Sequence, residues 1–250
     1  MKIPKKINPD RIKDSIIEIR YTSKLPFEIL LGIFFGALDD SFTYSGNPLI
    51  EQQIPTSFRV GELPEEVKLS LGNQHLFYND KIKIQFQPKS IIFNCLHEYI
   101  LWDNYKGQIE NVLSQLHSTN LIDQYNRIGV RYISQYPDYD LQDIIKFSFT
   151  FGMPNIQSDT YRFRSEFMWD SLRVILNLSN KSPVLTQEDV NFPPSIVKVS
   201  LIDIDVILDG FIESQLDKLI EKLVQTQLKE KEVFFNLLKE SYLESLKPEY

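Results

Sequence analysis

IEIRYTSKLP, residues 17–26, returns 111 residues later as IGVRYISQYP, residues 128–137. Both copies place alternating aliphatic residues before an Arg-Tyr pair, which is typical of a β-strand. The shared proline suits the first turn of a helix, where its missing N–H is not needed. The repeat therefore indicates two related halves, each opening with a strand that runs through a turn into a helix.

A second pattern repeats near the end of each half. Apolar residues at the spacing of one helix face occupy 109–116 and recur in 216–223, at an offset of 107 residues. Between the opening and closing elements, residues 74–96 and 161–208 contain strand-forming runs separated by turn residues. Each half is therefore predicted to contain an antiparallel meander between its opening helix and its closing helix.

These patterns predict an α+β fold with two similar halves, residues 1–122 and 123–250, or one compact unit made of both. Tandem halves of this kind resemble duplicated ferredoxin-like or TATA-binding-protein-like folds, although a fold does not establish a function. Any two amphipathic α+β halves would share apolar patterns, and this alternative to duplication stays open.

Five local predictions follow from the same patterns. Residues 27–38 are expected to form a buried helix, and Asp103 is expected to cap the helix that carries the 109–116 stripe. The Gly-, Pro-, Ser- and Asn-rich stretch 39–64 predicts a long irregular connection, and 180–194 predicts a loop. The apolar pattern over 233–246 predicts C-terminal helices that either pack within the chain or join a partner or a second subunit.

Composition excludes several classes of protein. The 250 residues carry a formal net charge of −7, which gives no global attraction to nucleic acid or anionic lipid. The single cysteine, Cys95, excludes an intrachain disulfide framework and a multi-cysteine zinc site. The chain lacks both the apolar stretch of a signal peptide and an apolar segment long enough to span a bilayer. We therefore expect a cytoplasmic protein without a membrane association.

Motifs for cofactor chemistry are missing from the sequence. Its nine glycines form neither a dinucleotide-binding loop nor a Walker-type phosphate loop, so no cofactor is predicted. Asp203 and Asp205 are the best acidic pair, because residues two apart on a strand point to the same face. Together they are a weak candidate for a divalent cation site. The alternative is the solvated outer face of an antiparallel strand.

Arginines form the remaining candidate sites. Arg162 and Arg164 share one face of a predicted strand and Arg173 follows after the turn, so the sheet is a candidate for binding single-stranded nucleic acid. Ordinary cross-strand pairing with Glu166 is the alternative. A separate candidate for a carboxylate or phosphate, or for a structural network, comes from the repeated Arg-Tyr pairs and a neighbouring arginine: Arg20, Tyr21, Arg127, Arg131 and Tyr132.

Three parts of the chain resemble a sporadically distributed, uncharacterised bacterial family of about this length. They are PDRIKDSIIEIRY at 9–21, RIGVRYIS at 127–134, and the aromatic-bearing C-terminal helices. Ser134 stands where the family pattern commonly has Asn, so a role that needs a carboxamide there is not implied. The resemblance implies no activity and no catalytic residues, and the patchy occurrence of the family hints at phage defence or toxin control.

The expected function is a non-enzymatic protein-interaction or regulatory module. Self-association or a protein partner is expected, with the C-terminal helices as the first candidate surface. The alternatives are a nucleic-acid-binding protein and a metal-dependent or RNA-processing nuclease that combines a basic surface with acidic residues.

Overall fold

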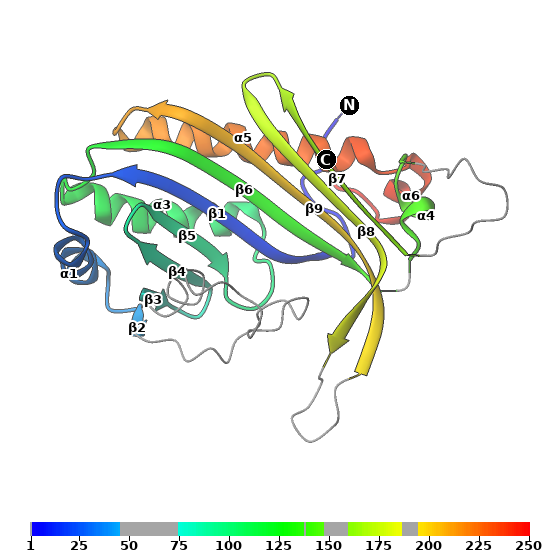
Figure 1. The fold of residues 1–250 in the computed structure, drawn as a ribbon, viewed down its shortest axis with the longest axis horizontal. Coiled ribbons are helices and arrows are strands. Elements are labelled where there is room, and N and C mark those ends of the chain that lie inside the picture. The colour runs from blue at the N-terminus through cyan, green and yellow to red at the C-terminus, as the bar shows by residue number, and fades with distance from the viewer. Residues whose placement is uncertain (1, 46–74, 138, 148–159, 187–194) are drawn as a thin grey trace. The chain divides into compact units, whose positions relative to one another are not determined.

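The computed structural model describes residues 2–45, 75–137, 139–147, 160–186 and 195–250. In these residues helices and strands follow one another as an α+β protein, as predicted (Figure 1). The first part of the chain forms β1 (Ile12–Thr22), α1 (Phe27–Ala37), β2 (Thr43–Ser45), β3 (His75–Tyr78), β4 (Ile82–Gln87), β5 (Ser90–Cys95) and α3 (Trp102–Ser118). The second part forms β6 (Gln124–Tyr136), α4 (Leu141–Ile144), β7 (Tyr161–Trp169), β8 (Leu172–Thr186), β9 (Ser195–Ile212), α5 (Leu216–Leu237) and α6 (Glu240–Ser245).

The described strands form one nine-stranded sheet in the order β2-β3-β4-β5-β1-β6-β9-β8-β7. The pairs β1–β5, β2–β3, β3–β4, β4–β5 and β7–β8 are antiparallel. In the first part of the chain the opening strand lies beside the last strand of its meander, giving β3-β4-β5-β1, and the second part gives β7-β8-β9-β6. The two predicted meanders are therefore present in the structure.

Two compact units can be distinguished, and neither is a continuous segment. One unit combines residues 1–13, 131–206 and 227–250, and the other combines residues 14–130 and 207–226. The units thus draw on both ends of the chain, whereas the halves predicted from the sequence are consecutive. Those consecutive halves stay a prediction.

The unit of residues 14–130 and 207–226 has an aromatic core beneath α1 and α3. The predicted stripe of α3, residues 109–116, is fully buried at its apolar positions. The buried Tyr105 hydroxyl donates a hydrogen bond of 3.2 Å to the Ser15 carbonyl and so joins α3 to β1. On α1, the Phe34 ring stacks on Phe86 of β4 at 4.3 Å between centroids. These contacts cover one face of β1, β4 and β5.

Helix α1 differs from the buried helix predicted over 27–38. Only Leu30 and Phe34 are buried, whereas Ile29, Ile33 and Phe35 are exposed. The physical reason is that a helix lying on a sheet buries one stripe, so an apolar sequence all round leaves the outer stripe uncovered. Among the described residues, no helix is both long and apolar enough to cross a membrane.

The unit of residues 1–13, 131–206 and 227–250 buries the C-terminal helices within the chain. Apolar residues of α5 and of the segment after it are buried, among them Val233, Leu238 and Leu246. On β6, Tyr132, Ser134 and Tyr136 are buried, while Ile133 and Gln135 are partly exposed. This alternation means that one face of the sheet is covered and the other carries polar side chains.

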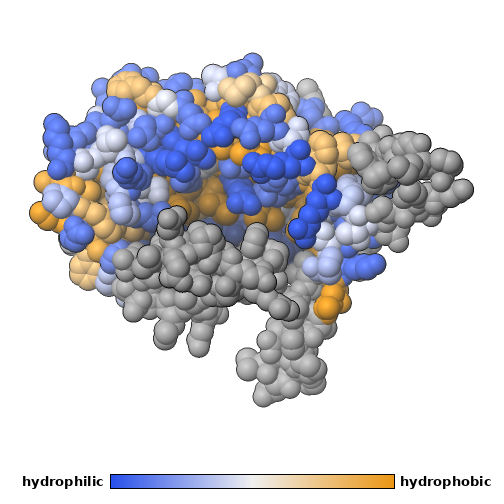
Figure 2. Space-filling view, viewed as in Figure 1, coloured by the Kyte–Doolittle hydropathy of each residue, from blue (hydrophilic) through white to orange (hydrophobic). Residues whose placement is uncertain are grey.

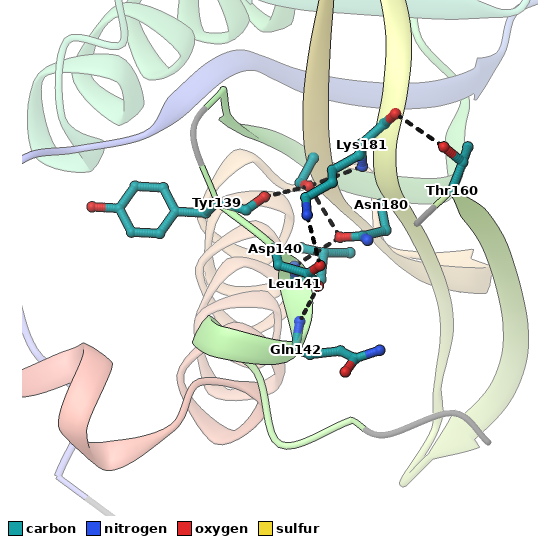
Figure 3. Close-up of polar contacts among 8 residues, drawn as sticks. Tyr139, Asp140, Leu141, Gln142, Thr160, Asn180 and Lys181 are labelled. Atoms are coloured by element: carbon teal, nitrogen blue, oxygen red, sulfur yellow. Dashed lines mark hydrogen bonds and ion pairs between the residues drawn. The ribbon is translucent and has the colours of Figure 1, made fainter. Parts of the chain in front are cut away.

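A polar cluster fixes the start of α4 against β8 and β9 (Figure 3). The Leu141 amide donates to the Asn180 Oδ1 at 2.8 Å. The buried Ser200 hydroxyl donates to the Tyr139 carbonyl at 2.7 Å and accepts the Lys181 amide at 3.0 Å. Because buried polar groups must be hydrogen-bonded, these bonds hold residues 139–141 in one position.

Three local predictions differ from the structure or lie partly outside its described residues. Asp103 does not cap α3: the helix begins at Trp102, Leu101 occupies the cap position, and no side chain caps it. The loop predicted over 180–194 is wrong in its first part, because β8 continues to Thr186, beyond the end of its pairing with β7 at Asn180. Residues 187–194 lie outside the described residues. In the connection predicted over 39–64, β2 occupies three positions, and residues 46–64 lie outside the described residues.

Candidate functional site

The centre of the candidate site is a bidentate pair between Arg131 on β6 and Asp203 on β9. The Arg131 Nε and Nη2 donate to the two carboxylate oxygens of Asp203, each at 2.8 Å. Asn177 on β8 donates a third hydrogen bond to Asp203 Oδ2 at 3.0 Å. A carboxylate held by a planar guanidinium and an amide is fixed in both position and orientation. This pair joins two candidates that the sequence analysis treated separately.

The same row of polar contacts continues to β7. Arg164 lies opposite Asn177 in the β7–β8 register and donates to the Asn177 Oδ1 at 3.0 Å. On its other side, Arg164 Nη2 lies 3.8 Å from Glu166 Oε2, and Arg173 on β8 donates to Glu166 Oε1 at 3.2 Å. The row, called the arginine–carboxylate network below, consists of Arg131, Asp203, Asn177, Arg164, Glu166 and Arg173.

The network lies on the uncovered face of its sheet strands. The side chain of Asp203 is only 13 % exposed, whereas those of Arg131 and Arg164 are 41 % and 60 % exposed. Hydrophilic residues likewise cover much of the surface that faces the viewer in Figure 2. The largely buried Asp203 thus holds Arg131 in position, whereas Glu166 is itself 46 % exposed; the guanidinium groups of Arg131 and Arg164 remain accessible to a ligand.

Asp205 and Arg162 extend this face at its two sides. Asp205 points to the same face as Asp203, as the two-residue period of β9 predicts. Arg162 is exposed on the same face of β7 as Arg164. Among the described residues, no group of three or more His, Cys, Asp and Glu lies close enough together to hold a metal ion. A cation at Asp203 would compete with the three hydrogen bonds that its carboxylate accepts.

Arg20 and Arg127 belong to the other compact unit and share Glu18. Arg20 Nε donates to Glu18 Oε1 at 2.9 Å. Arg127 Nε lies 3.1 Å from Glu18 Oε2 as an ion pair without hydrogen-bond geometry, and its Nη1 lies 3.7 Å from Asp209. Glu18 and Asp209 together balance the charges of the two arginines, and the cluster has the form of a structural network.

The tyrosines of the Arg-Tyr pairs lie on the opposite, buried face. Tyr21 donates its hydroxyl to the Gln87 carbonyl at 2.8 Å, and desolvation raises the pKa of this phenol. Tyr132 is buried in β6. Neighbours in a strand point to opposite faces, so neither tyrosine contacts a ligand that binds its neighbouring arginine. For the same reason Phe163 packs on Phe147, with ring centroids 4.6 Å apart, and does not stand beside Arg162 and Arg164.

Asn177 is the member of the network that the sequence analysis missed. It lies four residues after Arg173 on one strand, and this spacing places both side chains on the same face. Asn177 links the two halves of the network because it donates to Asp203 and accepts from Arg164. The strand period could have placed Asn177 on this face, but only the sheet order shows which residues it meets.

No protein-family model matches the chain, and no curated protein is significantly similar to it.

Proposed function

We propose that the chain is a non-enzymatic protein-interaction or regulatory module that binds its partner on the arginine–carboxylate network. The observation that carries this proposal is the pairing of exposed arginines with fixed carboxylates, centred on the bidentate bond between Arg131 and Asp203. Arginine is enriched at the centres of protein interfaces, where its planar group donates several aligned hydrogen bonds. A sheet face with charges of both signs in fixed positions gives specificity for a protein partner whose surface complements those charges.

The charge pattern favours a protein over a nucleic acid as the partner. A nucleic-acid site needs several cations that are available to phosphates. In the network, Arg131 already binds Asp203, and Arg164 and Arg173 both contact Glu166. A partner surface of mixed charge complements this arrangement, whereas a polyanion would be repelled by its carboxylates. Nucleic-acid binding is the second candidate, and the exposed Arg162 beside Arg164 favours it.

The enzyme alternative needs Asp203 and Asp205 to hold a metal ion. Asp203 would then have to exchange the guanidinium of Arg131 for the cation. This nuclease alternative predicts that replacement of either aspartate by alanine abolishes activity, while an interaction module predicts no catalytic loss.

We further propose that the chain arose by duplication and acts in the cytoplasm. Supporting the duplication, each part of the chain has an opening strand, a helix, a meander and a closing helix in the same order. The strand orders β3-β4-β5-β1 and β7-β8-β9-β6 also correspond. The resemblance of residues 127–134 to a sporadically distributed bacterial family leads us to propose a role in phage defence or toxin control.

The test is affinity purification of the tagged protein from its native host, with and without nuclease treatment. The wild-type chain is compared with the double variant Arg131→Ala/Arg164→Ala and with a control, Lys218→Ala, on the exposed surface of α5. Bound proteins are identified by mass spectrometry and bound nucleic acid by sequencing. We expect a protein that survives nuclease treatment and binds the control but is lost with the double variant.

Two other outcomes would overturn the proposal. A protein that is captured equally by all three variants does not use the network. The second outcome is the capture of a defined RNA or DNA whose binding weakens as salt rises. If Arg162→Ala or Arg164→Ala abolishes this binding, the face binds nucleic acid instead.

A further inference from the structure

Among the strands that the structure describes, β7 is an edge strand of the sheet. It stands at one end of the strand order and pairs over all nine of its residues with β8 (Figure 1). Among the described residues, no backbone hydrogen bond joins residues 162–169 to any other segment. An edge strand presents unpaired N–H and C=O groups on its outer side, and these can pair with another strand.

Some of the usual protections of an edge are missing from β7, and its three charged residues are of both signs. The strand contains neither proline nor glycine in nine residues, and it is rich in aromatic residues that favour strands. Two apolar side chains next to the turn are exposed, Phe167 at 37 % and Met168 at 64 %. Exposed apolar groups beside an unpaired edge indicate a surface that a second strand covers.

The sequence of β7 is complementary to itself when read antiparallel about Ser165. Arg164 and Glu166 then face each other across the pair, so two oppositely charged contacts form, one on each side of the centre. One step further out, Phe163 faces Phe167, and aromatic pairs of this kind stabilise neighbouring strands. The remaining pairs are Arg162 with Met168 and Tyr161 with Trp169, so the nine residues overlap completely.

We propose that two copies of this chain associate through antiparallel pairing of β7 with β7 of the partner, centred on Ser165. A two-fold axis at Ser165, perpendicular to the sheet, makes the interface isologous. Side chains that face each other in an antiparallel pair lie on the same side, so the polar faces of the two copies become continuous. The networks of both copies then lie on one surface, and a partner of the proposed function would meet two of them.

Other registers that keep the faces continuous are less favourable. Centring the pair on Arg164 places this residue against its own copy, and centring it on Glu166 does the same with a carboxylate. Like charges that face each other across a strand pair are destabilising. Pairing about Phe163 places Arg162 against Arg164 twice. The register about Ser165 alone combines full overlap with oppositely charged contacts.

The first experiment measures the oligomeric state of the full chain by sedimentation equilibrium. A strand pair buries less surface than a standard interface, so we expect a dimer of micromolar affinity, visible between about 1 and 100 µM. Its mass is twice the 29.4 kDa of one chain. Arg164→Glu and Glu166→Arg each turn two attractive contacts into two repulsive ones, and each should weaken the dimer on the order of tenfold.

The double variant Arg164→Glu/Glu166→Arg decides between this pairing and other interfaces. It exchanges the charges across the axis, so we expect dimerisation to return towards the wild-type value. Lys198→Glu, an exposed charge reversal on β9, is the control and should leave the dimer intact. Circular dichroism of each variant separates a lost contact from a lost fold.

A cysteine cross-link tests the register. In a Cys95→Ala background, Ser165→Cys places two thiols directly opposite each other, at a distance that mild oxidation can bridge. Arg162→Cys on the same strand faces Met168 of the other copy and should not cross-link. A disulfide-linked dimer of the first variant alone supports the pairing.

Three results would overturn this inference: a monomer at every concentration, a dimer indifferent to the single charge reversals, or equal cross-linking of both cysteine variants. None of them affects the proposed function, because a monomer can still bind a partner on its network. Conversely, a dimer without a captured partner supports the strand pairing and contradicts only the proposed function.

Discussion

Glu230 is a carboxyl group in the buried stripe of α5, and its side chain is only 4 % exposed. Desolvation raises the pKa of Glu230 well above its ordinary value of 4.5. Between pH 4.5 and the raised pKa of the folded state, the folded state binds one more proton than the unfolded state. The free energy of unfolding therefore falls as pH rises through this range. We expect Glu230→Gln to raise the free energy of unfolding at pH 8 by about 1 kcal/mol or more, and to change it little below pH 4.5.

Urea unfolding of both proteins between pH 4 and pH 8 measures this difference. Glu221→Gln, an exposed position on the same helix, is the matched control and should follow the wild-type pH dependence. If the wild type and Glu230→Gln lose stability in parallel as pH rises, the buried carboxyl is not the source of the pH dependence.

Asp39 shows the opposite shift on the surface. Its carboxylate accepts hydrogen bonds from the Ser41 hydroxyl and amide and from Gln115 and Asn111 of α3, which lower its pKa from 3.8 to about 2. A depressed carboxyl pKa contributes stability above pH 3.8 that is lost as the pH falls towards 2. Because Asp39 is exposed, Asp39→Asn should cost at most about 1 kcal/mol at pH 6.

The acid dependence provides the measurement for Asp39. Between pH 4 and pH 2 the wild type should lose more stability than Asp39→Asn, so that the two unfolding curves converge at low pH. Asp80→Asn serves as the control on the turn between β3 and β4. A constant gap between wild type and Asp39→Asn over this range would contradict the assignment.

At the scale of elements, Lys229 ties the β7–β8 turn to α5. Its Nζ lies 3.2 Å from Asp170 Oδ2 in the turn, 2.7 Å from Glu232 Oε2, and 4.5 Å from the centre of the Trp169 ring. Lys229→Met keeps the apolar stem but removes the charge, and it should destabilise the protein by about 1 kcal/mol. Amide hydrogen exchange should become faster in residues 168–172, which are then held by fewer contacts.

Lys222→Met on the same helix is the control for this prediction, since it removes an ammonium group that donates to the side chain of Gln225 on the same helix. Unchanged exchange in the turn of Lys229→Met, with an intact fold, would show that the β7–β8 pairing alone orders it. The edge strand would then be rigid without help from the helix.

Local sequence signals predicted most elements because each signal acts within a few residues. Period-two alternation located β4 and β7, and the three-and-four spacing located the buried stripe of α3. The same signals did not show that Asp103 leaves α3 uncapped or that α1 exposes Ile33. Burial depends on what lies across from an element, which the sequence of that element does not contain.

The arginine–carboxylate network shows that local sequence signals also fail to predict contacts between residues far apart in the chain. Arg131 and Asp203 were both candidates, but they are 72 residues apart and meet only because β6 and β9 are neighbours in the sheet. Strand order could not be derived from the sequence, so the arginine and the carboxylate were assigned to different sites. Asn177 was missed because no sequence pattern marks an asparagine that lies between two charged groups in the folded sheet.

At the scale of the whole molecule, the compact units predict how fragments behave. The sequence repeat suggests a cut after residue 122, yet the unit of residues 14–130 also needs residues 207–226, and the other unit needs residues 1–13. Fragments 1–122 and 123–250 would each lack part of a core. A domain that loses such apolar cover cannot offset the conformational entropy of folding.

We therefore expect neither fragment alone to unfold cooperatively, as followed by circular dichroism during urea titration. Coexpression of the two fragments should restore the transition of the full chain, because the missing segments are then present in the same solution. A cooperative transition of fragment 1–122 by itself would instead establish the consecutive halves as independent domains. The fragment experiment thus separates the proposed duplication, which concerns the history of the chain, from its folding, in which segments far apart in the sequence complete each core.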